Sequence, residues 1–132
     1  CMKTLVVDDE LTTRLILKNI LSPYGSCDTI SNGKEALKAF WMAMKEKEPY
    51  DLICLDILMP ELDGKTVLKK VREIEQKAGL PKNKMANIFM VTSLNDSKTI
   101  MDTIVKYKCD SYILKPISKA KVISKLKQFE LI

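Results

Sequence analysis

The stretch that decides the fold is DLICLDILMPELDG, residues 51 to 64. Its first part is a β-type run that is continuously apolar from Leu52 to Leu55 and ends at Asp56, just before a Met-Pro pair stops it. A strand with one solvated face would alternate apolar and polar residues, so the continuous run indicates a strand covered on both faces. It therefore predicts a parallel sheet between two layers of helices, with an acid at the carboxyl end of a buried strand.

Short β-type runs alternate with longer helical patterns on both sides of this stretch. The first helical pattern has apolar residues at 11, 15, 16 and 20, and the second has a predicted buried stripe of Ala36, Leu37, Phe40 and Met44. The alternation predicts an α/β domain of five β/α units. The predicted strands are residues 3–7, 27–30, 50–56, 87–91 and 110–114, and the predicted helices are residues 11–21, 34–48, 64–79, 96–106 and 118–129.

The length and composition are those of a single compact domain over residues 1–132. The chain has 132 residues, is 46% hydrophobic, and contains no run approaching the roughly 20 apolar residues of a membrane span. Nothing near the N-terminus resembles a signal peptide, so we expect a soluble, cytoplasmic protein with no membrane partner. Whether it is free-standing or part of a longer chain stays open.

The cysteine and histidine contents exclude several kinds of chemistry. The four cysteines show no C-x-x-C spacing and Cys54 lies in an apolar run, which favours reduced thiols; Cys1, ahead of Met2, is interpreted as a residue added in cloning. The chain has no histidine, which excludes a Ser-His-Asp site, the usual zinc ligand sets and a phosphohistidine of its own. Chemistry must therefore rest on carboxylates, hydroxyls and lysines.

Positive charge is concentrated in the last third of the chain. Residues 1–97 hold 14 Lys and Arg against 14 Asp and Glu, whereas residues 98–132 hold 8 lysines against 3 acids. The excess is interpreted either as a solvated helix face or as a docking face for an acidic partner. Direct nucleic acid binding is disfavoured, because this third has no arginine and no interleaved aromatic residues.

Polar residues follow four of the predicted strands at their carboxyl ends. Asp8 and Asp9 end the first strand, Asp56 the third and Thr92 the fourth, and Lys115 follows the fifth. Each alone has an ordinary structural explanation, since the acids and the threonine could cap helices and the lysine could be solvated. Ligand groups of open α/β sheets gather at the carboxyl edge, so we expect the five side chains to converge there.

The converging residues predict phosphoryl chemistry. Three carboxylates close together repel one another and need a cation, and an all-oxygen ligand set without His or Cys suits Mg²⁺. A lysine and a hydroxyl opposite the metal would bind the remaining oxygens of a phosphoryl group. Asp56 is then the candidate nucleophile, and Asp56, Thr92 and Lys115 are the predicted reactive set.

The motifs VVDDE, LICLDILMPELDG, VTS and YILKP, in this order, resemble the receiver domain of two-component response regulators over residues 3–129. The resemblance implies a flavodoxin-like sheet of order 2-1-3-4-5 flanked by five helices. It implies that Asp8, Asp9, Asp56 and the backbone carbonyl of Leu58 hold Mg²⁺. It also implies that Asp56 accepts the phosphoryl group from a histidine kinase or histidine phosphotransfer protein, and that Lys115 pairs with its oxygens.

The same resemblance implies a switch and a partner surface. Thr92 and Tyr112 would change position on phosphorylation and alter the face made by the fourth helix, fifth strand and fifth helix. The surplus lysines predicted to lie there and contact a downstream protein are Lys106, Lys108, Lys119, Lys121 and Lys125. The bond between Lys115 and Pro116 is expected to be cis.

Some residues depart from the family or suggest other classes. Leu58 and Leu94 are apolar where receivers of this kind influence hydrolysis of the phosphoryl group, which predicts slow dephosphorylation. The long polar connection at residues 77–87 has no predicted function. An unphosphorylated interaction module and a small aspartate-nucleophile phosphohydrolase stay as alternatives; the second is disfavoured because Leu58 stands where such an enzyme has an acid.

Overall fold

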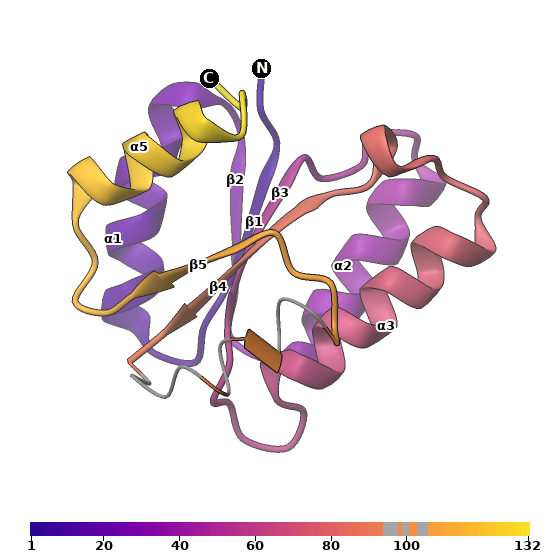
Figure 1. Ribbon diagram of the computed structural model, residues 1–132, viewed down its shortest axis with the longest axis horizontal. Coiled ribbons are helices and arrows are strands. Elements are labelled where there is room, and N and C mark those ends of the chain that lie inside the picture. Colours follow the sequence, from indigo (N-terminus) through magenta and orange to yellow (C-terminus); the bar gives the residue numbers. More distant parts are fainter. Residues whose placement is uncertain (94–97, 99–100, 103–105) are drawn as a thin grey trace.

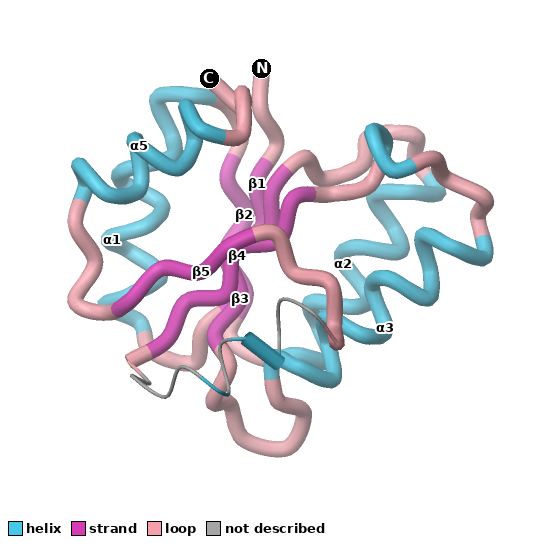
Figure 2. Tube along the Cα trace, viewed as in Figure 1, coloured by secondary structure: helices cyan, strands magenta, loops and turns pink. Residues whose placement is uncertain are grey.

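The computed structural model describes residues 1–93, 98, 101–102 and 106–132, and contains one five-stranded parallel sheet in the order β2-β1-β3-β4-β5 (Figure 2). This is the predicted α/β receiver fold, with the predicted strand order. The strands are β1 (Thr4–Val7), β2 (Cys27–Ile30), β3 (Leu52–Asp56), β4 (Asn87–Thr92) and β5 (Ser111–Leu114).

Helices cover both faces of the sheet, with α1 and α5 on one side and α2 and α3 on the other (Figure 1). Four helices are described in full where five were predicted: α1 (Leu11–Leu21), α2 (Gly33–Lys45), α3 (Gly64–Lys77) and α5 (Lys119–Gln128). The predicted helix at 96–106 lies largely outside the described residues, although Lys98, Met101 and Asp102 are helical. Two short 3₁₀ turns, η1 (Ser22–Tyr24) and η2 (Lys82–Lys84), complete the chain order.

The continuous apolar run of β3 serves two separate cores. Ile53 and Leu55 pack with α2 and α3, whereas Leu52 and Cys54 pack with α1 and α5. Successive side chains of a strand point to opposite faces, so a strand covered on both sides needs apolar residues at every position. Asp56, the next residue, is also buried but carries a carboxylate.

The first helix buries a different face from the one that its apolar spacing suggested. Leu11, Leu15 and Ile16 are exposed, and of the four predicted positions only Ile20 joins the core. The buried face consists of Thr13, Leu17, Ile20 and Leu21. In α2 the predicted stripe is confirmed, since Ala36 and Phe40 are buried and Leu37 and Met44 lie at its margin.

A buried polar network anchors the connection at residues 77–87, for which the sequence suggested no role. The Arg72 guanidinium donates to Glu75 Oε1 at 2.7 Å, to Asp110 Oδ2 at 2.9 Å and to the carbonyl of Ala86 at 2.9 Å. Glu75 Oε2 accepts from the Ala86 amide at 2.7 Å, and Asp110 Oδ2 from the Ile88 amide at 2.7 Å. The network therefore joins α3 to the starts of β4 and β5.

No disulfide joins the cysteines, all four of which are among the described residues, and Cys54 and Cys109 are buried. Within the described ranges, every helix is too short or too polar to cross a bilayer.

Candidate functional site

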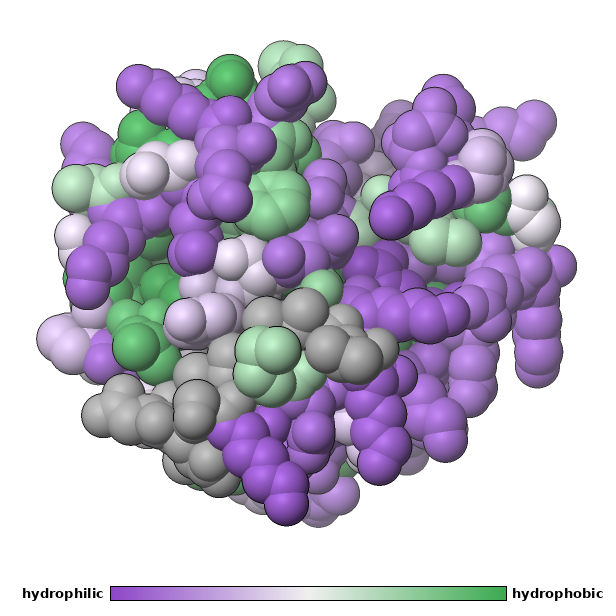
Figure 3. Space-filling view, in the orientation of Figure 1, coloured by the Kyte–Doolittle hydropathy of each residue, from purple (hydrophilic) through white to green (hydrophobic). Residues whose placement is uncertain are grey.

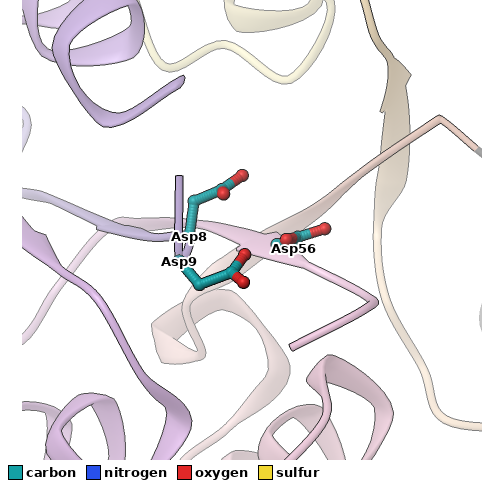
Figure 4. A group of neighbouring side chains, drawn as sticks. All are labelled: Asp8, Asp9 and Asp56. Carbon is teal, nitrogen blue, oxygen red and sulfur yellow. The ribbon is translucent and has the colours of Figure 1, made fainter. Parts of the chain in front are cut away.

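Three acids meet at the carboxyl edge of the sheet. Asp8 and Asp9 follow β1 and Asp56 ends β3, and these strands are hydrogen-bonded neighbours with Val7 opposite Leu55. One carboxylate oxygen from each acid lies within 4.8 Å of the others. Figure 4 shows the three side chains together. Asp8 and Asp56 are only 1% and 4% exposed, whereas Asp9 faces solvent. The predicted convergence of the acids is therefore observed.

Lys115 extends into the same cluster from the end of β5. Its Nζ atom lies 3.2 Å from Asp8 Oδ2 and 3.8 Å from Asp56 Oδ1. A third carboxylate, that of Glu10, accepts a hydrogen bond from it at 2.9 Å. The Lys115–Pro116 bond that redirects the chain here is cis, as predicted.

Burial and charge repulsion shift the ionisation of the central acid. Burial, followed by the neighbouring Asp8 charge, raises the pKa of Asp56 from 3.8 to about 7, although Lys115 acts in the opposite direction. For Lys115, burial alone would lower the pKa, but contacts with Glu10, Asp56 and Asp8 outweigh it, so its pKa is raised. The lysine is therefore a stable cation beside a carboxyl group that needs positive charge to ionise fully.

The donor set fits a hard divalent cation. Asp8 Oδ1 accepts a hydrogen bond from the Glu10 amide at 2.9 Å, while the buried Asp8 Oδ2 makes no well-aligned hydrogen bond and lies 3.2 Å from the Lys115 ammonium. A buried carboxylate oxygen with acceptor capacity left over is suited to a metal ligand bond. The remaining donors are carboxylate oxygens, which suit Mg²⁺ better than a transition metal. The part assigned to the Leu58 carbonyl stays a prediction; the Leu58 side chain itself is 60% exposed.

The two predicted switch residues lie on adjacent strands. Thr92 is buried at the end of β4, and its carbonyl accepts from the Lys115 amide at 2.8 Å. Tyr112 on β5 is half-buried against the core formed with α2 and α3. The Lys125 ammonium lies 5.5 Å from the centre of the Tyr112 ring.

The five predicted partner lysines divide into two groups. Lys119 and Lys121 are exposed on α5, and the half-buried Lys125 donates to Ser111 Oγ at 2.8 Å. Lys106 and Lys108 are also exposed, but they line a cleft with residues of α3. Lys121 and Lys125 line a different cleft, between β5 and α5. That all five lysines contact one downstream protein stays a prediction.

Glu10 is a site residue that the sequence analysis missed. One signal was present: glutamate is not among the residues that favour the N-cap position. In the structure Glu10 is the N-cap, but its side chain makes no capping hydrogen bond and contacts Lys115 instead.

Comparison with known proteins identifies the family of the chain. The family model of the response regulator receiver domain matches residues 4–127. The chain is 34% identical over 127 residues to a chemotaxis protein CheY homolog of Campylobacter jejuni, covering 95% of this chain and 89% of that protein. It is 37% identical over 117 residues to a probable transcriptional regulator, ycf27, of Cyanidium caldarium, covering 86% of this chain and 40% of that protein.

Solved structures show the same fold. The CheX-CheY-BeF3-Mg²⁺ complex from Borrelia burgdorferi matches with a TM-score of 0.81 and 27% identity, over 97% of this chain and 89% of the other. The receiver domain of Ssk1, solved with the histidine phosphotransfer protein Ypd1 of Saccharomyces cerevisiae, matches with a TM-score of 0.81 and 22% identity, over 96% and 87%.

The chain belongs to the response regulator receiver domain family of two-component signalling. It spans less than half the length of the ycf27 regulators that it matches.

Proposed function

We propose that this receiver domain accepts a phosphoryl group on Asp56 from a phosphohistidine of a partner kinase or phosphotransfer protein. The observation that carries the proposal is the meeting of three carboxylates and one lysine, with Lys115 Nζ within 3.8 Å of both Asp8 and Asp56. A phosphoryl acceptor needs this combination of a nucleophilic carboxylate and a cation for the transferred oxygens. A module that only binds a partner does not require a buried carboxylate crowded by other acids, which is costly in free energy.

Each residue has a distinct part in the transfer. A carboxylate oxygen of Asp56 attacks phosphorus, a P–O bond forms, and the P–N bond to the donor imidazole breaks. Asp8, Asp9, Asp56 and the Leu58 carbonyl would hold Mg²⁺, which neutralises charge on the phosphoryl oxygens when bound. Lys115 supplies a second positive charge to those oxygens and favours the ionised, reactive form of Asp56.

Exposed apolar residues close in the sequence to the acids support docking of a protein phosphodonor. Leu11, Leu15 and Ile16 are exposed on α1, which begins two residues after Asp9, and Leu58 is exposed two residues after Asp56. Exposed apolar patches mark protein contact surfaces. A partner that covered them would also exclude water from the transfer.

The output would pass through Thr92 and Tyr112. Thr92 can bind a phosphoryl oxygen by moving toward Asp56, and Tyr112 can then turn inward, which would alter the β5 and α5 surface. A groove of about 410 Å³ between these elements includes Tyr112, Leu114, Lys121 and Lys125 in its lining. Hydrophilic residues with hydrophobic residues between them lie over α5, at the upper left of Figure 3. We expect an acidic downstream protein to bind the phosphorylated form better, and less tightly as salt rises.

Mass spectrometry of the intact protein tests the phosphoacceptor role. Incubation with a small phosphodonor and Mg²⁺ should add one phosphoryl group, Asp56→Asn should abolish the addition while weakening Mg²⁺ binding, and Asp9→Ala should reduce both. No addition to the wild type would favour the inert module, and rapid donor turnover without accumulation would favour the phosphohydrolase. Undiminished phosphorylation of Asp56→Asn protein would refute the assignment.

A further inference from the structure

The Lys115 ammonium makes its shortest carboxylate contact with Glu10, outside the three acids of the predicted metal site. The distance from Nζ is 2.9 Å to Glu10 Oε1, against 3.2 Å to Asp8 Oδ2 and 3.8 Å to Asp56 Oδ1. The Lys115 side chain is 17% exposed and that of Glu10 is 62% exposed. The lysine is therefore drawn toward the solvent side of the site and away from the phosphoacceptor.

Glu10 has no evident structural role that explains this contact. Its side chain makes no capping bond to α1, although the residue occupies the N-cap position. Its amide donates to Asp8 Oδ1 at 2.9 Å, which holds its backbone beside the acids. From there the glutamate side chain, one methylene longer than the aspartate or asparagine of a usual N-cap, extends to Lys115.

We infer that Glu10 is a positioning residue that competes with Asp56 for Lys115 and so weakens the affinity of the unphosphorylated site for a phosphoryl group. The inference rests on the proposed function, because it concerns the lysine that would pair with the transferred oxygens. A phosphoryl group on Asp56 carries close to two negative charges and attracts the ammonium strongly. To move toward the phosphoryl oxygens, the Lys115 ammonium must lengthen or break its hydrogen bond to Glu10.

The size of the effect follows from the exposure of the pair. Ion pairs with one solvated partner contribute little to an equilibrium, so releasing Lys115 should change a binding constant by about two- to fivefold. The pair is screened by salt, and the difference should shrink as ionic strength rises. Glu10 thus tunes the site and is not required for phosphorylation.

Binding of beryllofluoride, a phosphoryl mimic, tests the competition. Mg²⁺ affinity is first measured for each variant, and beryllofluoride is then titrated at saturating Mg²⁺ with backbone amide NMR signals as the readout. Glu10→Gln should bind the mimic about two- to fivefold more tightly. Glu10→Asp should also bind beryllofluoride more tightly, because the aspartate side chain is one methylene shorter and its carboxylate does not reach Lys115. Glu46→Gln, which removes an exposed charge at the C-terminal end of α2, should match the wild type.

The same titration separates competition for the lysine from simple repulsion between Glu10 and the phosphoryl group. If Glu10 acts through Lys115, Glu10→Gln should have no effect in a Lys115→Met background, since coupled residues are not additive. A gain that persists in that background, a Glu10→Asp variant that behaves as wild type, or an unchanged affinity in Glu10→Gln would each overturn the inference. Failure of the wild type to bind beryllofluoride would instead count against the proposed function.

Discussion

Gly64 lies against the backbone of Asp56, so closely that a Cβ atom at position 64 would stand 2.0 Å from the Asp56 carbonyl oxygen. The Gly64 amide also donates to the Ile57 carbonyl at 2.8 Å, which closes the loop that follows β3. The start of α3 is thereby packed directly onto the predicted phosphoacceptor, and only a residue without a side chain fits.

Gly64→Ala should therefore destabilise the protein and disturb the site together. The clash is with backbone, which cannot rotate away, so we expect a loss at the upper end of the about 1–3 kcal/mol typical of overpacking. Urea unfolding measures the stability and a Mg²⁺ titration measures the site. Gly79→Ala is the control: it has φ +71° but nothing within 4 Å of an added Cβ, so it should cost about 1–2 kcal/mol and leave Mg²⁺ affinity unchanged. Wild-type Mg²⁺ affinity in Gly64→Ala would contradict the packing argument.

The raised pKa of Asp56 predicts that metal-free protein loses stability as pH rises. Between the ordinary value of 3.8 and the native pKa of about 7, the folded protein keeps a proton that the unfolded chain has released. This contribution is complete below about pH 4 and is lost as pH rises through about 7, with a slope of at most about 1.4 kcal/mol per pH unit. Unfolding free energies from pH 5 to 8 in a chelator should fall for the wild type relative to Asp56→Asn. Parallel pH curves for the two proteins would show that Asp56 is not perturbed.

The buried Arg72–Glu75 pair should contribute strongly to the free energy of unfolding, and losing one of the two residues should cost more than losing both. Arg72→Met would leave the Glu75 carboxylate, 1% exposed, without its cation, and removing one member of a buried pair costs about 3–5 kcal/mol. The double variant Arg72→Met, Glu75→Leu should recover part of that loss, because the Glu75 carboxylate no longer stays buried without a cation; Asp110, 29% exposed, still loses its partner, so recovery is incomplete. Chemical denaturation of the three proteins gives the comparison. A double variant less stable than Arg72→Met alone would be inconsistent with a charge-burial origin.

Leu58 should slow loss of the phosphoryl group. Hydrolysis needs a water in line with the acyl phosphate, and an apolar side chain two residues after Asp56 cannot orient one. Leu58→Asn should therefore shorten the lifetime of phosphorylated protein in Mg²⁺ buffer, followed by mass spectrometry; Leu94, the other residue implicated, lies outside the described residues. Met42→Asn, an apolar-to-asparagine change on the exposed face of α2, is the control. Equal decay rates in wild type and Leu58→Asn would remove the hypothesis.

The sequence alone determined the sheet and the meeting of the acids. The unbroken run from Leu52 to Leu55 implied burial on both faces, and chain order in a parallel β/α fold brings the residues after β1, β3 and β5 to one edge. These features depend on local periodicity and on the order of elements along the chain, both of which can be read from sequence.

Only the tertiary structure decided which side chains meet across that framework. It placed Leu11 and Leu15 of α1 outside the core, put Lys108 and Lys121 in the linings of different clefts, and joined Glu10 to Lys115 across 105 residues of sequence. Periodicity shows that a helix has an apolar side but not how far it is rotated against the sheet. Contacts between distant side chains depend on rotamers and packing of the whole domain, which no local pattern contains.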